Sequence, residues 1–162
     1  MGTGQSGRYL NTKGSGRKVS DFALVHSNEG TFTYTPKGHH ISKLLSGGHG
    51  QAGMDLLDKL GIQYNIVKTY QNGVRIGNIP DHKDKLKRSG TGQSWFPKNW
   101  TARDIRHAGE HIAGLKGNRH IADGKKIFGV WKGVRVVVIR THGKIATIFP
   151  DTDQQNGLNR RR

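Results

Sequence analysis

The stretch that decides the fold lies near the end of the chain, where residues 126–150 read KIFGVWKGVRVVVIRTHGKIATIFP. Three runs of mainly β-branched and aromatic residues, 126–131, 134–140 and 144–150, are separated by short turns that each contain a glycine. Runs of this kind are typical of β-strands, and short glycine turns join strands that lie antiparallel. The stretch therefore predicts a three-stranded antiparallel meander.

The rest of the chain predicts two helices and two further hairpins. Runs 62–70 and 74–79 flank an Asn-Gly pair, which is the strongest short-range signal for a hairpin. Apolar residues at helical spacing predict one helix over 51–60, which ends at a glycine, and a second over 101–116, which a threonine caps. Residues 21–35 surround an Asn-Glu-Gly turn and predict a short hairpin. Together these elements form a compact α+β domain, with two helices packed on an antiparallel sheet of about five strands.

The charge points to a polyanionic partner. The 162 residues include 27 Lys and Arg against 11 Asp and Glu, a formal net charge of +16. A small domain this basic is typical of proteins that meet a polyanion, which can be nucleic acid, an anionic membrane surface or an acidic protein partner. The chain has no cysteine, which excludes disulfides, iron–sulfur clusters and thiolate zinc sites. No apolar run approaches the ~20 residues of a membrane-spanning helix, so we expect no membrane insertion by this domain.

Composition divides the chain into three parts. The first 20 residues hold four cationic residues and no acidic one, so we interpret residues 1–38 as a basic, flexible linker. Residues 39–154 contain most of the predicted elements and form the domain itself. Residues 155–162 are polar and basic and are expected to be disordered.

The histidines suggest a particular chemistry. RNA can be cleaved without a metal when one group accepts the 2′-OH proton, a second protonates the 5′-oxygen and a cation stabilises the phosphorane. Two of the nine histidines stand in suggestive surroundings. His49 lies between glycines at the start of a predicted helix, where backbone can approach a phosphate. His82 opens the cationic loop 82–93, which ends in Gly-Thr-Gly-Gln.

Several ordered motifs carry a resemblance to a known family. They are Gly47-Gly48-His49-Gly50-Gln51, Asn72-Gly73-Val74-Arg75-Ile76-Gly77-Asn78, His82-Lys83, Gly92-Gln93-Ser94-Trp95-Phe96-Pro97, Trp100-Thr101 and Ile145-Ala146-Thr147-Ile148-Phe149-Pro150-Asp151. Over about residues 44–154 the chain resembles the bacterial EndoU nuclease domain, which is found as the C-terminal toxin module of large secreted polymorphic toxins.

The resemblance implies a fold shared with barnase-like and RelE-like ribonucleases. It also implies endoribonucleolytic cleavage that leaves a 2′,3′-cyclic phosphate and needs no cofactor or metal. His49 and His82 match the two catalytic histidines of the family. Thr147 and Phe149 match its terminal Thr-x-aromatic element, where the threonine binds phosphate or base and the aromatic ring stacks on a base.

Two departures from the family pattern affect the assignment. Gln93 stands where many members have a lysine, so the catalytic cation has to come from elsewhere, and Lys87 is our choice on its proximity to His82. Lys83, Arg88, Gln93 and Phe149 are the expected substrate-binding residues. The spacing between the two assigned histidines is longer than in many members, which leaves His40 as an alternative partner for His49.

The resemblance also implies a biological setting. As a toxin module, the chain would be secreted as part of a larger protein and would act on RNA, with tRNA as one candidate, in the cytoplasm of a target cell. A nuclease that kills has to be restrained in its producer, so we expect an acidic immunity protein that covers the basic cleft. We expect the domain itself to be a monomer.

Two other interpretations, a metal-dependent DNase and a non-catalytic binding module, stay open at this point, and a zinc-protease pattern is rejected. The paired histidines 39–40, with Asn65 and His82, are similar to the metal-dependent HNH motif, which would make DNA the substrate. Residues 107–111 match the H-x-x-E-H pattern of zinc proteases, although a further acidic ligand is missing downstream. A non-catalytic nucleic-acid-binding module would need only the net charge of +16.

Overall fold

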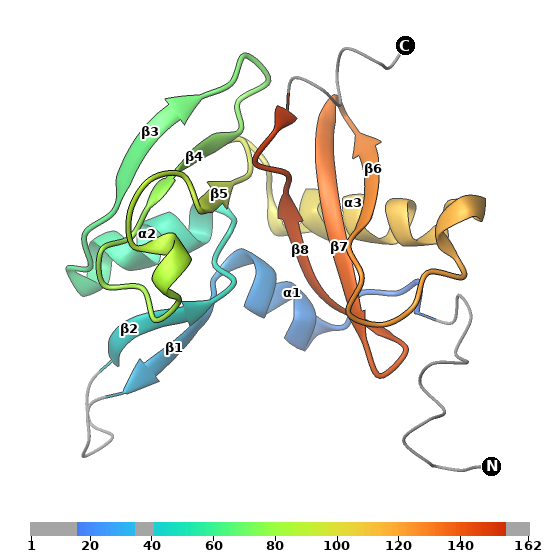
Figure 1. Cartoon of the computed structure of the whole chain (residues 1–162), viewed down its shortest axis with the longest axis horizontal. Helices are drawn as coiled ribbons and strands as arrows, with labels where there is room; N and C mark the ends of the chain where they lie inside the picture. Colours follow the sequence, from blue (N-terminus) through green and yellow to red (C-terminus); the bar gives the residue numbers. More distant parts are fainter. Residues whose placement is uncertain (1–15, 35–40, 155–162) are drawn as a thin grey trace.

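The computed structural model of the chain describes residues 16–34 and 41–154, which form an α+β domain as predicted (Figure 1). No helix in these ranges is both long and apolar enough to cross a membrane. The described elements are α1 (Asp21–Asn28), β1 (Thr31–Tyr34), β2 (Ile41–Ser46), α2 (Gln51–Leu60), β3 (Asn65–Thr69), β4 (Arg75–Asn78), η2 (Lys85–Lys87), β5 (Gln93–Trp95), α3 (Ala102–Gly114), η3 (Lys116–Asn118), β6 (Ile127–Trp131), β7 (Val134–Thr141) and β8 (Lys144–Pro150), where η denotes a 3-10 helix.

The strands form three antiparallel sheets with the orders β1-β2, β3-β4-β5 and β6-β7-β8. The predicted meander and the predicted Asn-Gly hairpin are both confirmed, as β6-β7-β8 and β3-β4. The predicted numbers of elements, about five strands and two helices, are too low, since the described residues form eight strands and three α-helices. The strands absent from the prediction are β2 and β5, while β1 lies inside the segment predicted as a hairpin. β5 has three residues, and β2 reads ISKLLS, which does not alternate strictly between apolar and polar residues.

The predicted hairpin over residues 21–35 is wrong, because this segment begins with helix α1. The hydroxyl of Ser20 caps the helix by accepting a hydrogen bond from the Ala23 amide at 3.1 Å. Ala23 and Ser27 are buried at helical spacing, and the side chain of Phe22 points to solvent. The apolar pairs that suggested a strand belong to a short helix with one buried side.

Two hydrophobic cores hold the elements together. In Figure 1, α3 lies behind the sheet β6-β7-β8 and packs on one of its faces. Thr101 and Asp104 form a capping box at the start of α3, which confirms the predicted threonine cap. A smaller core lies under α2 on the other side of the molecule. The larger core includes Ile105, Ala108, Ile112, Ile127, Val136, Val138 and Ile148, and the smaller one Leu44, Met54, Leu57, Ile62, Ile79 and Trp95.

The other face of the sheet β6-β7-β8 is not covered by α3. Successive side chains of a strand point to opposite faces, so the residues that alternate with the core residues Val136, Val138 and Ile148 lie on this other face. Phe128 is opposite Val137, and Val137 is opposite Phe149, which gives one row across the three strands. We call this side of the sheet the open face.

The packed domain begins earlier than the predicted boundary at residue 38. Helix α1 packs against β8 and α3, and the Ser27 hydroxyl accepts a hydrogen bond from the Ile148 amide at 3.0 Å. The buried guanidinium of Arg140 donates to the carbonyl of Gly16 at 2.8 Å, which ties the start of the described chain to β7. Residues 16–34 therefore belong to the domain and not to a linker. The tail 155–162 predicted to be disordered lies outside the described residues.

Candidate active site

A pocket of about 440 Å³ opens between α1, the end of β2, the loop that contains η2, and the open face. It brings together side chains from distant parts of the sequence, among them two histidines and two lysines. The lining residues include His26, Ser46, Gly47, His49, Lys87, Ser94, Lys126, Val137, Thr147, Phe149, Asp151 and Thr152.

The two pocket histidines are brought together by a short backbone ladder. The amides of Gly48, His49 and Gly50 donate to the carbonyls of His26, Ser27 and Asn28 at 3.0, 2.6 and 3.1 Å. These carbonyls belong to the last turn of α1, where a helix leaves its carbonyls without internal partners. The ladder satisfies them and, by doing so, sets the position of His49 relative to His26.

The glycines around His49 make this ladder possible. Gly47 has φ +74°, and a Cβ atom there would overlap the carbonyl oxygen of His26. A Cβ atom at Gly53 would lie 2.7 Å from the carbonyl oxygen of Asn28. From the sequence, the glycines around His49 are expected to let the backbone approach a ligand. The structure shows that Gly47 and Gly53 approach the end of α1 instead.

His49 is buried, with only 3% of the residue exposed. Its Nδ1 lies 2.7 Å from the carbonyl oxygen of Ser94. Because a carbonyl only accepts, Nδ1 carries the proton of the neutral ring and Nε2 is left as a proton acceptor. Burial, followed by the charge of Lys87, holds the pKa of His49 well below its usual value of 6.5. The ring is therefore neutral at pH 7.

His26 lies on the opposite side of the pocket and was not predicted as a site residue. Its Nδ1 is 2.7 Å from the hydroxyl of Thr31, which can either donate or accept a hydrogen bond. The side chain is partly buried, and burial together with the charge of Lys87 lowers its pKa from 6.5. The hydroxyl can thus hold the ring in place whether or not Nδ1 carries a proton.

Lys87 supplies a positive charge beside both rings. It is half-buried at the end of η2, and burial lowers the pKa of its ammonium, an effect that the charge of Asp84 partly offsets. Among the described residues it forms no ion pair. An ammonium without a carboxylate partner in a pocket is available to an anionic ligand.

His82, the predicted partner of His49, does not line this pocket. It is fully buried, and its Nδ1 accepts a hydrogen bond from the Asp84 amide at 2.7 Å. Burial, followed by the charge of Lys87, lowers the pKa of His82 to about 4. His49 and His26 therefore line the pocket together, whereas His82 lies outside its lining, in the loop that carries Lys87.

The remaining predicted site residues divide into two groups. Thr147 and Phe149 line the pocket with Lys87, and the Phe149 ring lies 5.3 Å from the His49 ring between centroids. Gln93, Arg88 and Lys83 do not line it. Gln93 is fully buried and its amide donates to the Gly47 carbonyl at 3.4 Å, while the Arg88 guanidinium donates to the His82 carbonyl at 3.0 Å. The alternative partner His40, with the paired histidines 39–40, lies outside the described residues.

Replacing His82 by asparagine is expected to reduce the acid sensitivity of the fold. In the folded protein the ring stays neutral down to a pKa of about 4, whereas in the unfolded chain it takes up a proton near 6.5. The unfolded state therefore binds more protons between these values, and the free energy of unfolding falls as the pH falls through them, by roughly 2–3 kcal/mol from this residue. Asparagine keeps an acceptor for the Asp84 amide and does not titrate.

Urea unfolding at a series of pH values from 7.5 to about 4 tests this. The variant is expected to lose less stability than the wild type over this range. Parallel curves for the two proteins would contradict the buried, neutral state of His82.

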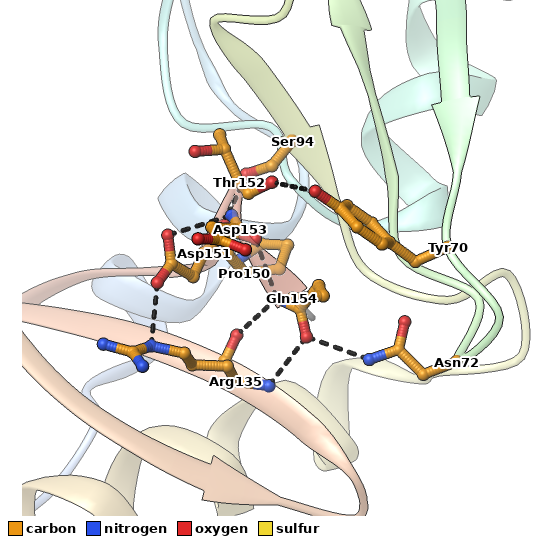
Figure 2. A network of polar contacts seen from close by, with 9 residues as sticks. All are labelled: Tyr70, Asn72, Ser94, Arg135, Pro150, Asp151, Thr152, Asp153 and Gln154. Atoms are coloured by element: carbon orange, nitrogen blue, oxygen red, sulfur yellow. Dashed lines mark hydrogen bonds and ion pairs between the residues drawn. The ribbon is translucent and has the colours of Figure 1, made fainter. Parts of the chain in front are cut away.

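A polar network fixes the chain that leaves β8 beside the pocket (Figure 2). The Tyr70 hydroxyl donates to the Thr152 carbonyl at 2.6 Å, and Asp151 pairs with Arg135 at 2.8 Å. The Gln154 side chain accepts from the Arg135 amide and donates to the Asp151 carbonyl. Hydrogen bonds from the β3-β4 hairpin and from β7 thus hold the pocket residues Asp151 and Thr152 in place.

A second, larger cavity of about 1030 Å³ lies between residues 16–20, the end of α3 and the β7-β8 turn. Its cationic side chains are exposed, and neither of the two histidines in its lining, His111 and His142, is buried. Glu110, the acidic residue of the H-x-x-E-H pattern, accepts a hydrogen bond from the Val19 amide at 2.9 Å. That carboxylate therefore serves to hold the N-terminal segment against α3.

The protein-family match covers the part of the chain that forms the smaller pocket. The model of a family described as bacterial EndoU nuclease matches residues 25–152. The match begins one residue before His26 and ends at Thr152, so it includes every residue that lines the pocket. Neither the curated proteins nor the solved structures compared with the chain include a match. Since the family model covers well over half of the sequence, the chain belongs to the bacterial EndoU nuclease family.

Proposed function

We propose that this nuclease is an endoribonuclease that cleaves RNA by metal-independent transphosphorylation. In this reaction the 2′-oxygen attacks the adjacent phosphorus, the bond from phosphorus to the 5′-oxygen breaks, and a 2′,3′-cyclic phosphate and a 5′-hydroxyl are left. The reaction needs a proton acceptor, a proton donor and a cation. The observation that carries the proposal is that His49, His26 and Lys87 line a single pocket.

His49 is the general base in this proposal. Its Nδ1 is held by the Ser94 carbonyl at 2.7 Å, so Nε2 is the nitrogen that accepts the 2′-OH proton. Burial lowers the pKa of the ring and keeps it in the neutral form that a base requires.

His26 is the general acid and Lys87 stabilises the charge of the phosphorane. His26 is less buried than His49, and its pKa is lowered less, so it is the ring that more readily carries the second proton. The Thr31 hydroxyl at 2.7 Å can adapt to both protonation states during turnover. The unpaired ammonium of Lys87 lies beside both rings, where negative charge develops.

Thr147 and Phe149 complete the pocket on the side of β8. They are separated by one residue and therefore point to the same face of the strand. The hydroxyl of Thr147 can hydrogen-bond to a phosphate or to the edge of a base, and the ring of Phe149 offers a stacking surface. These two residues are proposed to orient the nucleotide whose 2′-oxygen reacts.

Incubation of the purified chain with a short oligoribonucleotide in EDTA tests the proposal. We expect cleavage, and we expect mass spectrometry to find a fragment one water lighter than the linear phosphate, which identifies the cyclic product. A matched oligonucleotide with 2′-O-methyl groups throughout lacks the nucleophile and is expected to stay intact.

The competing interpretations give different results in the same assay. Cleavage of plasmid DNA that requires added Mg²⁺, with RNA intact in EDTA, would support an HNH-type nuclease and overturn the proposal. Tight binding of RNA without cleavage under either condition would favour a non-catalytic module.

A further inference from the structure

The open face continues from the pocket toward β6 and carries a second aromatic ring, which is exposed. Phe128 is 40% exposed and lies on β6, an edge strand of the sheet β6-β7-β8. It occupies the same cross-strand row as Phe149, with Val137 between them. Val137 and Phe149 both line the pocket, so the row runs from the pocket outward.

The ring of Phe128 is covered on one side by a guanidinium. The Cζ atom of Arg135 lies 4.6 Å from the centroid of the ring, and its Nε pairs with Asp151 at 2.8 Å. Asp151 is itself a pocket residue and is fixed by the network in Figure 2. The guanidinium of Arg135 thus lies over the phenyl ring of Phe128, and both groups are of the kind on which nucleobases stack in RNA complexes.

The surroundings of this stack favour a nucleic acid as its ligand. Lys126 directly precedes β6, two residues before Phe128, is exposed, and lines the pocket. It forms no ion pair with any described residue. Aromatic rings interleaved with cations, on a protein with a net charge of +16, are the pattern of a single-strand-binding surface.

The spacing of the two rings indicates an extended strand. Neighbouring strands of a sheet lie about 4.7–4.9 Å apart, so rings on β6 and β8 are separated by about twice that distance. Consecutive nucleotides of one strand in a duplex rise only about 3.4 Å. Two neighbouring nucleotides with bases bound at Phe149 and at Phe128 are therefore unstacked from each other, as in an extended single strand.

We infer that Phe128, backed by Arg135, forms a second base-stacking subsite for single-stranded RNA, next to the nucleotide bound at Phe149. This inference rests on the proposed function, because it extends the substrate beyond the reacting nucleotide. The ligand of the pocket and this subsite together is then unpaired RNA that is longer than two nucleotides.

Binding of uncleavable RNA tests the subsite separately from catalysis. Fluorescence anisotropy is measured with a labelled 2′-O-methyl hexanucleotide and a labelled 2′-O-methyl dinucleotide of mixed sequence. Stacking on a protein ring contributes about 1–3 kcal/mol per base, so Phe128→Ala is expected to raise the Kd of the hexanucleotide about tenfold. The Kd of the dinucleotide, which fills the pocket alone, is expected to stay unchanged.

Three further variants separate stacking from general effects. Phe128→Trp keeps a flat ring and is expected to bind the hexanucleotide as the wild type does, whereas Phe128→Leu keeps apolar volume without a ring and is expected to bind as poorly as Phe128→Ala. Phe22→Ala is the matched control, since Phe22 is 82% exposed on α1 and does not line the pocket. It is expected to have no effect.

Two results would overturn the proposed subsite. A hexanucleotide that binds the wild type no better than the dinucleotide would exclude a second base, and full affinity in Phe128→Leu would exclude stacking. If the wild type binds the hexanucleotide through Phe128 and yet cleaves no RNA, the proposed catalytic function fails and the subsite stands.

Discussion

Replacing His26 by alanine is expected to lower kcat for RNA cleavage by at least about 10²- to 10⁴-fold, the range that general acid–base groups contribute. The same loss is expected for His49→Ala. His26 is the stronger test, because only the structure places it in the pocket, through the bonds that join the end of α1 to the loop of His49. Single-turnover cleavage of a defined oligoribonucleotide, with folding checked by circular dichroism, measures the effect.

His82→Asn is the matched control for this prediction. It removes an imidazole that contributes nothing to the pocket lining, so cleavage is expected to remain near the wild-type rate. A loss in His82→Asn as large as that in His26→Ala would return the catalytic role to His82.

The pH profile provides an independent measurement on the wild type. The base has to be unprotonated, so kcat/KM rises with pH through the pKa of His49. The acid has to be protonated, so kcat/KM falls as the pH rises through the pKa of His26. Because both pKa values lie below 6.5 in the free protein, the maximum of kcat/KM is expected on the acidic side of that value. A maximum above pH 7 would contradict these roles.

Gly47→Ala is expected to destabilise the fold by about 4 kcal/mol. A non-glycine residue at φ +74° costs about 1–2 kcal/mol, and the new Cβ atom would overlap the carbonyl of His26. Relief of that overlap moves the loop away from α1 and weakens the three hydrogen bonds between them, each of which contributes about 0.5–1.5 kcal/mol. Urea unfolding measures the free energy difference.

Gly61→Ala separates strain from overlap. Gly61 caps α2 with φ +72°, and nothing lies within 4 Å of a Cβ atom placed there. This control is expected to cost only the conformational part, about 1–2 kcal/mol. Equal losses in the two variants would show that the close packing of the glycine loop on α1 adds nothing to stability.

Local sequence patterns predicted most of the regular structure. The meander β6-β7-β8, the Asn-Gly hairpin, helix α2 with its glycine stop and helix α3 with its threonine cap each depend on residues that are close in sequence. The strands β2 and β5 were not predicted, because β5 has only three residues and the sequence of β2, ISKLLS, does not alternate strictly. The sequence of α1 did not predict a helix, because its eight residues show little helical periodicity of apolar side chains.

The candidate site was only partly predictable. His49, Lys87, Thr147 and Phe149 stand in local contexts that suggest a ligand, and all four line the pocket. His26 has no such context, and its place depends on contacts between α1 and a loop more than 20 residues away. The N-cap residue Ser20 is a local signal for the start of α1, but it does not indicate which part of the chain packs against the end of the helix. His82 was misleading because a histidine among cations also suits a buried, neutral ring.

The three hydrogen bonds between the end of α1 and residues 48–50 affect how sites with this pair of histidines can be found in other sequences. Three N–H to carbonyl bonds define how far His49 stands from His26, and the chain that connects them covalently takes a separate route through β1 and β2. The relative position of His26 and His49 therefore does not depend on the number of residues between β1 and β2. Insertions after Tyr34 are expected to leave it unchanged. A search of sequences for two histidines at fixed separation would pass over relatives that keep the same site. A search for a helix end followed by a Gly-Gly-His-Gly segment would retain them.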